Sequence, residues 1–184
     1  MGECDGVAIM KVTKFAVMIL FASCMSAAWA APTFDSVTFG KQSTHCDAKN
    51  TRGTVVPDGS GISIFFDKMQ IEAGGTAHKH ERMRCDVTLK LTAPLDAPVT
   101  IQMDVRGMVD LTGGGTASAT VTYLGHTEPV RFQWKDDGGI DRIKINLPKG
   151  THQLGLSFEA SAKGKFSDST ALIAIDSLEA VLAR

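Results

Sequence analysis

From about Phe34 onward, apolar and polar residues alternate along the chain between clusters of Gly, Pro, Asp and Ser. Successive side chains of a β-strand point to opposite faces of the sheet, so this alternation indicates strands with one buried and one solvated face. The clearest strand is residues 99–106, where apolar side chains occupy one face and polar side chains the other. Helical spacing of apolar residues is absent over most of this part, which argues against a helical domain.

The same alternation predicts further strands, at residues 62–66, 85–91, 121–123, 130–134, 143–147 and 154–158. Turn residues separate them, as at Pro57-Asp58-Gly59 and Pro148-Lys149-Gly150. About eight to ten short strands with such turns predict an all-β fold, an antiparallel β-sandwich of the jelly-roll or the immunoglobulin-like type. Segment Thr170–Leu182 is apolar at both alternating positions, which predicts a central strand covered on both faces, with a short helix as the open alternative.

The segment Met10–Ala30 has the three parts of a secretory signal peptide. Two lysines form a positive region, an apolar run follows at residues 15–22, and Ala28-Trp29-Ala30 matches an A-x-A cleavage site. We therefore predict a signal peptide at residues 1–30 and a mature chain of residues 31–184 that forms a single domain.

The predicted signal peptide also bears on the start of translation and on membrane attachment. Glu3 and Asp5 place negative charge where a signal peptide needs positive charge, so Met10 is the expected start. The apolar run is shorter than the roughly 20 residues that cross a bilayer, so we expect no membrane span. These features predict a secreted or periplasmic protein. A lipid anchor at Cys24 is the open alternative, because residues 21–24 approximate a lipoprotein cleavage box.

Cys46 and Cys85 are the cysteines that remain after cleavage at residue 30. In an exported chain two cysteines predict one disulfide, which here would brace the sandwich. Cys85 alternates in phase with Val87 and Leu89, so we expect the bridge to be buried. The alternative is a thiolate metal site, for which the usual C-x-x-C spacing is missing.

The charges are balanced and interspersed, with 19 Lys and Arg against 20 Asp and Glu. A protein that binds a nucleic-acid backbone needs a concentrated basic surface, so the composition argues against a nucleic-acid partner. An anionic membrane surface is disfavoured for the same reason.

Several short segments resemble a known family in their order and spacing. They are Phe34–Gly40 with a cysteine soon after it, Ile62–Asp67, Arg82–Cys85, Asp104–Gly107 and Tyr123. Over about residues 34–124 they resemble the secreted family filed as domain of unknown function 4360. The resemblance implies export, a β-rich domain and a Cys46–Cys85 bridge, and it implies no activity. Thr44-His45-Cys46-Asp47 stands where the family usually shows Gly-x-Gly-Cys-Pro, which leaves the local turn open.

His78 and His80 are candidate metal ligands. Residues two apart in a strand share a face, so their imidazoles would chelate copper or zinc, with His45 or Met83 as a further ligand. The alternative is a solvated polar loop after Gly74-Gly75.

A second candidate cation site is the acidic segment that contains Asp136, Asp137 and Asp141. Three carboxylates suit calcium in a flexible loop. The alternate spacing of calcium loops is missing and Asp-Gly is a hairpin signal, so a plain turn is the alternative.

Arg106 lies at the end of the clearest predicted strand, on the same polar face as Asp104. A structural role would be an ion pair across strands or a turn that needs Gly107. The alternative role is contact with a ligand.

Motifs of catalysis are missing, since the chain has neither a G-x-S-x-G elbow nor H-E-x-x-H. Gly150–Leu178 resembles the closing strands of jelly-roll carbohydrate-binding modules. We therefore predict an exported, non-enzymatic binding or surface-interaction module, with a glycan or another cell-envelope component as its partner. A secreted copper or zinc protein is one alternative. A polysaccharide hydrolase is the other, and it would need a pair of carboxylates in one cleft.

Overall fold

The computed structural model describes residues 31–40, 45–47, 49–74, 80–132, 139–165 and 169–183. The predicted signal peptide, the expected start at Met10 and the alternative anchor Cys24 lie outside the described residues. Within the described ranges the chain forms eleven strands and no helix. These ranges accordingly hold no helix that would span a membrane.

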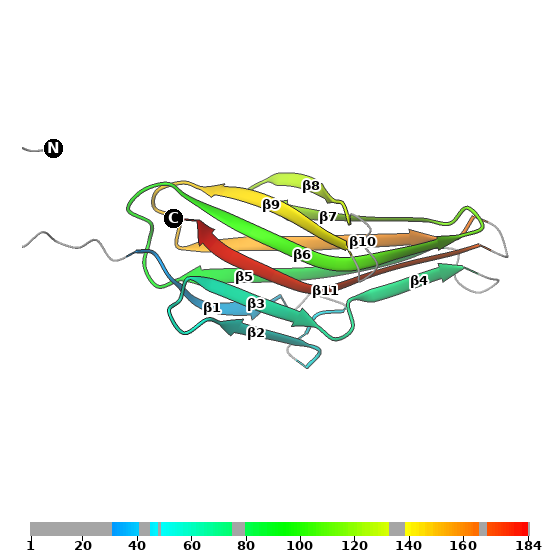
Figure 1. Cartoon of the computed structure of the whole chain (residues 1–184), viewed down its shortest axis with the longest axis horizontal. Coiled ribbons are helices and arrows are strands. Elements are labelled where there is room, and N and C mark those ends of the chain that lie inside the picture. Colours follow the sequence, from blue (N-terminus) through cyan, green and yellow to red (C-terminus); the bar gives the residue numbers. More distant parts are fainter. Residues whose placement is uncertain are drawn as a thin grey trace, which may run out of the picture. The chain divides into compact units, whose positions relative to one another are not determined.

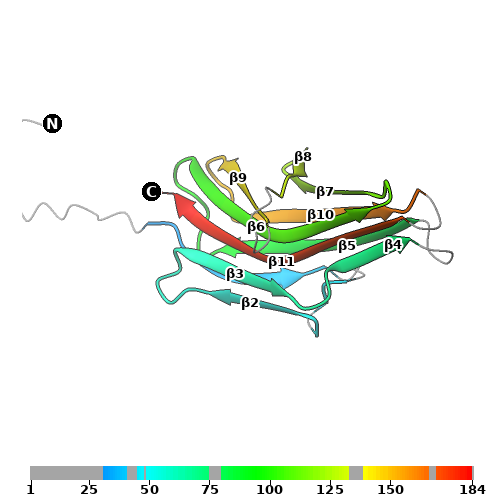
Figure 2. The same cartoon turned by 45° about the vertical axis from the view of Figure 1, so that its right-hand side comes forward.

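The strands pair into two antiparallel sheets (Figure 1). The five-stranded sheet has the order β1 (Phe34–Phe39), β5 (His80–Leu91), β10 (Gln153–Lys163), β7 (Thr116–Tyr123) and β8 (His126–Val130). The six-stranded sheet has the order β2 (Thr51–Val55), β3 (Gly61–Phe66), β11 (Thr170–Ala183), β6 (Val99–Thr112) and β9 (Gly139–Leu147), and β4 (Gln70–Gly74) also pairs with β11. β3 and β4 lie end to end along one edge of β11 (Figure 2).

The sheets lie face to face, which confirms the predicted antiparallel β-sandwich. Seven of the ten connections between the described strands pass from one sheet to the other, and the exceptions are the β2–β3 and β7–β8 hairpins and the step from β3 to β4. This winding is closer to a jelly-roll than to an immunoglobulin domain, which keeps more of its consecutive strands in one sheet.

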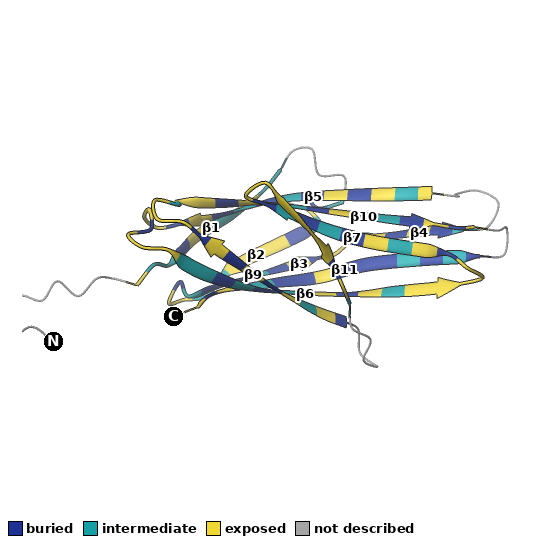
Figure 3. Cartoon of the chain, turned by 90° about the horizontal axis from the view of Figure 1, so that it is seen from above, coloured by how far each residue is buried: buried dark blue, intermediate teal, exposed yellow. Residues whose placement is uncertain are grey.

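Alternating residues supply the core between the sheets (Figure 3). β5 sends Cys85, Val87 and Leu89 inward, each at most 1% exposed, and the central strand β10 sends Phe158 inward. Burial of an apolar side chain of this size contributes about 1.5–3 kcal/mol, so these inward rows fix which face of each strand is buried. The predicted alternation at 85–91 is confirmed, and the opposite rows of β5 and β10 face outward.

β11 is the central strand that was predicted at residues 170–182. The prediction that it is covered on both faces holds for only part of the strand, because some residues of its outer face are exposed to solvent. A β-bulge at Asp176 shifts the register against β6 between Ile175 and Ser177. Ile175 and Leu178 both point inward as a result, although they differ in parity. The bulge explains the change of parity after Ile175, whereas Leu172 and Ala174 precede it and lie on the outer face. On this face Ala174 is buried at 5% exposure and Val181 is 47% exposed, so the cover is partial.

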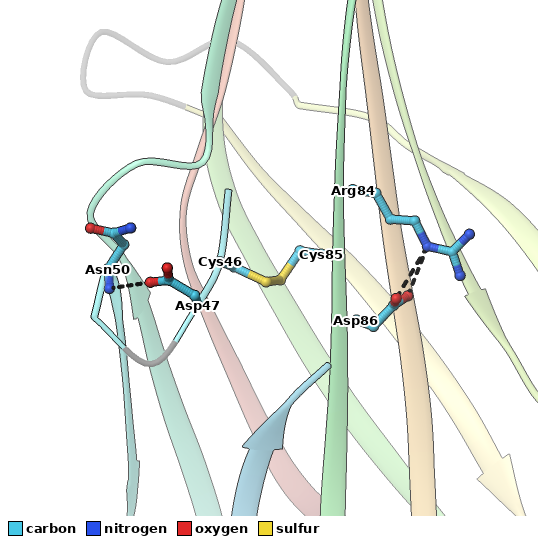
Figure 4. Close-up of a disulfide and its surroundings, with 6 residues drawn as sticks. All are labelled: Cys46, Asp47, Asn50, Arg84, Cys85 and Asp86. Carbon is cyan, nitrogen blue, oxygen red and sulfur yellow. Dashed lines mark hydrogen bonds and ion pairs between the residues drawn. A yellow bond between two sulfur atoms is a disulfide. The ribbon is translucent and has the colours of Figure 1, made fainter. Parts of the chain in front are cut away.

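The disulfide joins Cys46, in the connection between β1 and β2, to Cys85 in the middle of β5 (Figure 4). Both cysteines are 0% exposed, so the predicted buried bridge is confirmed. Asp47 follows the disulfide cysteine, and its Oδ1 accepts hydrogen bonds from the backbone N–H groups of Lys49 and Asn50, each at 3.0 Å. The carboxylate thus closes the turn that the sequence left open.

Candidate ligand-binding groove

Two neighbouring hollows lie on the outer face of the five-stranded sheet, over β5, β10 and β7. The larger has a volume of about 520 Å³, and its polar lining is Arg82, Arg84, Ser118, Thr120, Glu159 and Ser161. The smaller has a volume of about 290 Å³, and its lining includes Asp86, Thr88, Thr122, Leu124, Gly155 and Ser157. We call the two hollows together the sheet groove.

Small side chains on β10 and β7 form the floor of the sheet groove. Gly155 and Ser161 on β10 and Ser118 on β7 leave space that longer side chains would fill. The hydroxyls of Ser118 and Ser161, which face each other across the two strands, lie 3.0 Å apart. Because outward side chains recur at every second residue of a strand, Ser118, Thr120 and Thr122 form a row of hydroxyl groups along β7.

Arg84 lies between the two hollows. Its Nε donates to Asp86 Oδ1 at 3.0 Å and Oδ2 at 3.2 Å (Figure 4), and its Nη1 lies 3.3 Å from Glu159 Oε1. Ion pairs this exposed contribute little to stability, typically below about 1 kcal/mol. Their main effect is to hold the three charged groups in place along the groove.

The candidate metal ligands are only partly described. His78 lies outside the described residues, His80 is the first residue of β5, and His45 precedes the buried Cys46. His80 Nε2 accepts a hydrogen bond from Arg82 Nε at 3.4 Å. The described ranges contain no group of three His, Cys, Asp or Glu side chains that would hold a metal ion.

The β7–β8 hairpin borders the smaller hollow. Leu124 and Gly125 form its tip with φ angles of 47° and 79°, and Leu124 is 47% exposed. A left-handed conformation costs a residue other than glycine roughly 1–2 kcal/mol. Leu124 therefore presents an apolar side chain to the groove at a cost in backbone strain.

Tyr123, beside this tip, is buried, and its hydroxyl donates to Glu128 Oε1 at 2.6 Å. Burial, together with the nearby Glu128 carboxylate, raises the pKa of Tyr123 from 10.0 to about 12. Because the raised pKa favours the neutral phenol, its contribution to stability is complete below pH 10.0 and is lost as the pH rises through about 12.

We expect ultraviolet titration of the folded protein to show phenol ionisation at about pH 12, and of the urea-unfolded protein at the ordinary value of 10.0. The chain contains one tyrosine, so the tyrosinate signal belongs to Tyr123 alone. Glu128→Gln removes the neighbouring negative charge and should move the folded-state midpoint downward. A folded-state midpoint equal to the unfolded one would contradict the buried, hydrogen-bonded phenol.

Asp104 and Arg106 lie on the outer face of the six-stranded sheet and do not line the sheet groove. Arg142 of β9 donates to both carboxylate oxygens of Asp104 at 2.8 Å each, and this hydrogen bonding lowers the pKa of Asp104 despite its partial burial. Arg106 Nη2 lies 3.6 Å from Glu179 Oε2 on β11. Both side chains thus take part in ion pairs between neighbouring strands.

Gly107 does not form a turn, so the expectation of a turn at this residue is wrong. It lies in the interior of β6, which continues to Thr112. A Cβ at Gly107 would collide with the carbonyl oxygen of Ala174 and lie 2.7 Å from Cζ of Phe132. Gly139, the partner of Gly107 on β9, makes room for the same phenylalanine. The two glycines form a slot for Phe132.

The alternation predicted a strand at residues 130–134 that would include Phe132, but β8 ends at Val130.

Asp136 and Asp137 of the candidate calcium loop lie outside the described residues, as does Trp134. Asp141 lies in β9, and its Oδ2 accepts the backbone N–H of Arg131 at 2.7 Å. In the described part of the segment the carboxylate therefore serves a backbone contact.

The sheet groove was not predicted from the sequence. Arg82 and Arg84 occur in a segment that carries the family resemblance, but the polar rows of β5 and β10 have the pattern of any solvated sheet face. Glu159, Ser118 and Ser161 carry no motif. Their juxtaposition depends on the pairing of β10 with β5 and β7, which alternation within a single strand does not reveal.

Three of the solved structures with a similar fold are a subviral particle, a carbohydrate-binding module and the latent form of PorU. The VP2 subviral particle of infectious bursal disease virus has 13% sequence identity and a TM-score of 0.39, and the match covers 73% of this chain and 33% of the VP2 chain. The carbohydrate-binding module TmCBM61, solved with β-1,4-galactotriose, has 12% identity and a TM-score of 0.33, with 83% and 90% of the two chains covered. Latent PorU from Porphyromonas gingivalis has 11% identity and a TM-score of 0.22, with 83% and 13% covered. At such scores none of these likenesses carries an inference about ligand or activity.

No curated protein matches the sequence. A family model does match it, over residues 35–171, which include β2 to β10 and the first residues of β11. The segments that suggested the resemblance fall within or at the edge of this match, as do Cys46, Cys85 and the strands that form the sheet groove. The chain therefore belongs to the family described as domain of unknown function (DUF4360).

Proposed function

We propose that the protein is an exported, non-enzymatic binding module that takes a glycan or another polar cell-envelope polymer in the sheet groove. The observation that carries this proposal is the pair of neighbouring polar hollows on the outer face of the five-stranded sheet. Side chains on paired strands are held more firmly than side chains on loops, so the groove offers a preorganised surface.

The chemistry of the groove fits a hydroxyl-rich polymer. Ser118, Ser161 and Thr120 each offer a hydroxyl that donates and accepts hydrogen bonds, and Arg84 and Glu159 add charged groups. The aromatic residue among the described lining residues is Tyr123, whose ring is buried. Recognition therefore rests on hydrogen bonds and charge rather than on stacking of sugar rings.

A polysaccharide hydrolase is less well supported. Glycosidases use two carboxyl groups on either side of the bond that they cleave. Among its described lining residues the larger hollow has one carboxylate, Glu159, and the smaller has Asp86. Arg84 contacts both, so neither is an isolated carboxyl group of the kind that acts as a general acid.

Export is supported by the predicted signal peptide and by the buried disulfide, since such bonds persist in oxidising compartments. The proposed location is secreted or periplasmic. Attachment to a membrane through a lipid on Cys24 is the alternative.

Copper or zinc binding by His78, His80 and His45 remains a prediction. His80 lies beside Arg82 and opposite Lys163 in the β5–β10 register, and these cationic neighbours repel a metal ion. Calorimetric titration with either metal, compared with His80→Ala, tests the prediction.

Gly155→Trp tests the proposed function. A Cβ at Gly155 would meet no atom within 4 Å, so a large side chain there fills the smaller hollow without a backbone clash. On an array of glycans and cell-envelope polymers, we expect the protein to bind a subset and Gly155→Trp to weaken that binding about ten-fold or more, a loss of about 1.4 kcal/mol.

Gly155→Ala is the matched control, because it adds a Cβ to the same open position without filling the hollow. Its binding should equal that of the unmodified protein. An array without a bound polymer would contradict the ligand class. Binding unchanged by Gly155→Trp would contradict the location.

A further inference from the structure

We infer that the sheet groove binds an acidic polysaccharide, whose carboxylate or sulfate groups contact Arg82 and Lys163 at one end of the groove. The inference rests on the proposed function and names the class of ligand. It follows from the placement of cationic side chains on β5 and β10, from the absence of acidic partners for Arg82 among the described residues, and from the hydroxyl row beside it.

The register of β5 and β10 brings the cationic groups together. Arg82 is paired with Ser161, and His80, the next outward residue of β5, is paired with Lys163. Side chains paired across antiparallel strands have Cβ atoms about 4.5–5.5 Å apart, so Arg82, His80 and Lys163 form one cluster. All three are exposed, and Arg82 also lines the larger hollow. The cluster therefore continues the groove along its long direction.

Arg82 differs from four other arginines in the described part of the chain. Arg52, Arg84, Arg106 and Arg142 each lie 2.8–3.6 Å from a carboxylate oxygen. Arg82 contacts no carboxylate among the described residues, and its Nε donates a hydrogen bond to the imidazole of His80. Within the described residues the terminal nitrogens of Arg82 are therefore available to an anion.

A guanidinium presents two parallel N–H donors that match a carboxylate or sulfate, and such charge-assisted bonds are about twice as strong as neutral ones. Glu159, the carboxylate that lines the larger hollow, is already paired with Arg84 and does not neutralise Arg82. The hydroxyls of Ser161 and Ser118 lie beside Arg82 in the register and suit the sugar hydroxyls next to an acidic group. A neutral glycan would use the hydroxyl row and leave the cationic cluster unpaired.

The experiment measures binding of polygalacturonate, dextran sulfate and uncharged dextran by calorimetry, at low and at high salt. At low salt we expect at least one acidic polymer to bind about ten-fold or more tightly than dextran. Added salt should weaken that binding, since the contacts are exposed. The two acidic polymers distinguish carboxylate from sulfate recognition.

Arg82→Gln and Lys163→Gln remove the charges in question, and each should weaken binding of the acidic polymer several-fold. Arg52→Gln is the matched control, because Arg52 is an exposed arginine of β2 in the other sheet, and it should bind like the unmodified protein. Thermal melting checks that all three variants fold. The inference would be overturned if dextran bound as tightly as the acidic polymers. It would also be overturned if Arg82→Gln bound the acidic polymer as tightly as the unmodified protein does.

The outcomes separate this inference from the proposed function. The protein would bind neutral glycans through the groove if Gly155→Trp weakened that binding and Arg82→Gln left it unchanged. This result would overturn the inference of an acidic ligand and would support the groove as the binding site. Binding of an acidic polymer that Gly155→Trp leaves unchanged would overturn the groove. Equally tight binding of a single-stranded DNA of similar charge would show a general polyanion site and would also overturn the inference.

Discussion

Replacement of both Cys46 and Cys85 by alanine is expected to lower the free energy of unfolding by about 4 kcal/mol, on the loop-closure estimate for a bridge of this length. The bridge joins residues 39 positions apart, so its removal frees a long loop in the unfolded chain. Both sulfur atoms also belong to the buried core, since both cysteines are 0% exposed. For a domain of this size the loss corresponds to a melting temperature lower by about 8–16 °C.

Thermal and urea unfolding of the double variant, followed by circular dichroism, measure this effect. Reduction of the unmodified protein is the control, because it breaks the bridge and keeps both sulfur atoms in the core. Agreement between the reduced protein and the double variant assigns the loss to the bridge. A double variant with the same melting temperature as the oxidised protein would show that the connection from β1 to β2 is held in place without the disulfide.

Gly107→Ala should destabilise the fold by about 3 kcal/mol, although it adds a single methyl group. The new Cβ would meet the Ala174 carbonyl oxygen on β11 and Cζ of Phe132. The carbonyl belongs to the backbone of the neighbouring strand, so relief of the contact requires displacement of β6 or β11. Because these are adjacent strands in the six-stranded sheet, the cost should appear in global unfolding.

Gly155→Ala is the matched control in urea denaturation, since a Cβ there meets nothing within 4 Å. It should leave stability unchanged or raise it slightly, because glycine weakens a strand interior. Phe132→Ala combined with Gly107→Ala would relieve the contact with the ring but not that with the backbone, so part of the loss should persist. Equal stability of Gly107→Ala and Gly155→Ala would refute the close approach at Gly107.

The strands with a strong two-residue period were predictable because burial on one face selects the same residue types at every second position. β2 and β8 lack this signal, and in β4 it spans only Gln70 to Ala73. Each has five residues, and β8 contains Pro129, which an edge strand tolerates because no partner needs its N–H. The bulge at Asp176 was hidden for a related reason, since a shift in parity within one strand resembles a strand buried on both faces.

The candidate site was less predictable than the fold. Ion pairs such as Arg142 with Asp104 need the register between β6 and β9, and the groove needs the register of three strands far apart in sequence. A single strand specifies which of its faces is buried, but it carries no information on which strand lies beside it. The disulfide was predictable because so few cysteines remained to pair.

The strand order has a consequence for the biosynthesis of the protein. β10 is the middle strand of one sheet and β11 the middle strand of the other, and they are the last two strands of the sandwich in chain order. A nascent chain that lacks them has isolated pairs such as β2–β3 and β7–β8, with nothing to join β5 to β7 or β3 to β6. Domains begin to fold during synthesis when the segments already made can pair with one another. This domain therefore cannot complete either of its sheets until β10 and β11 have been synthesised.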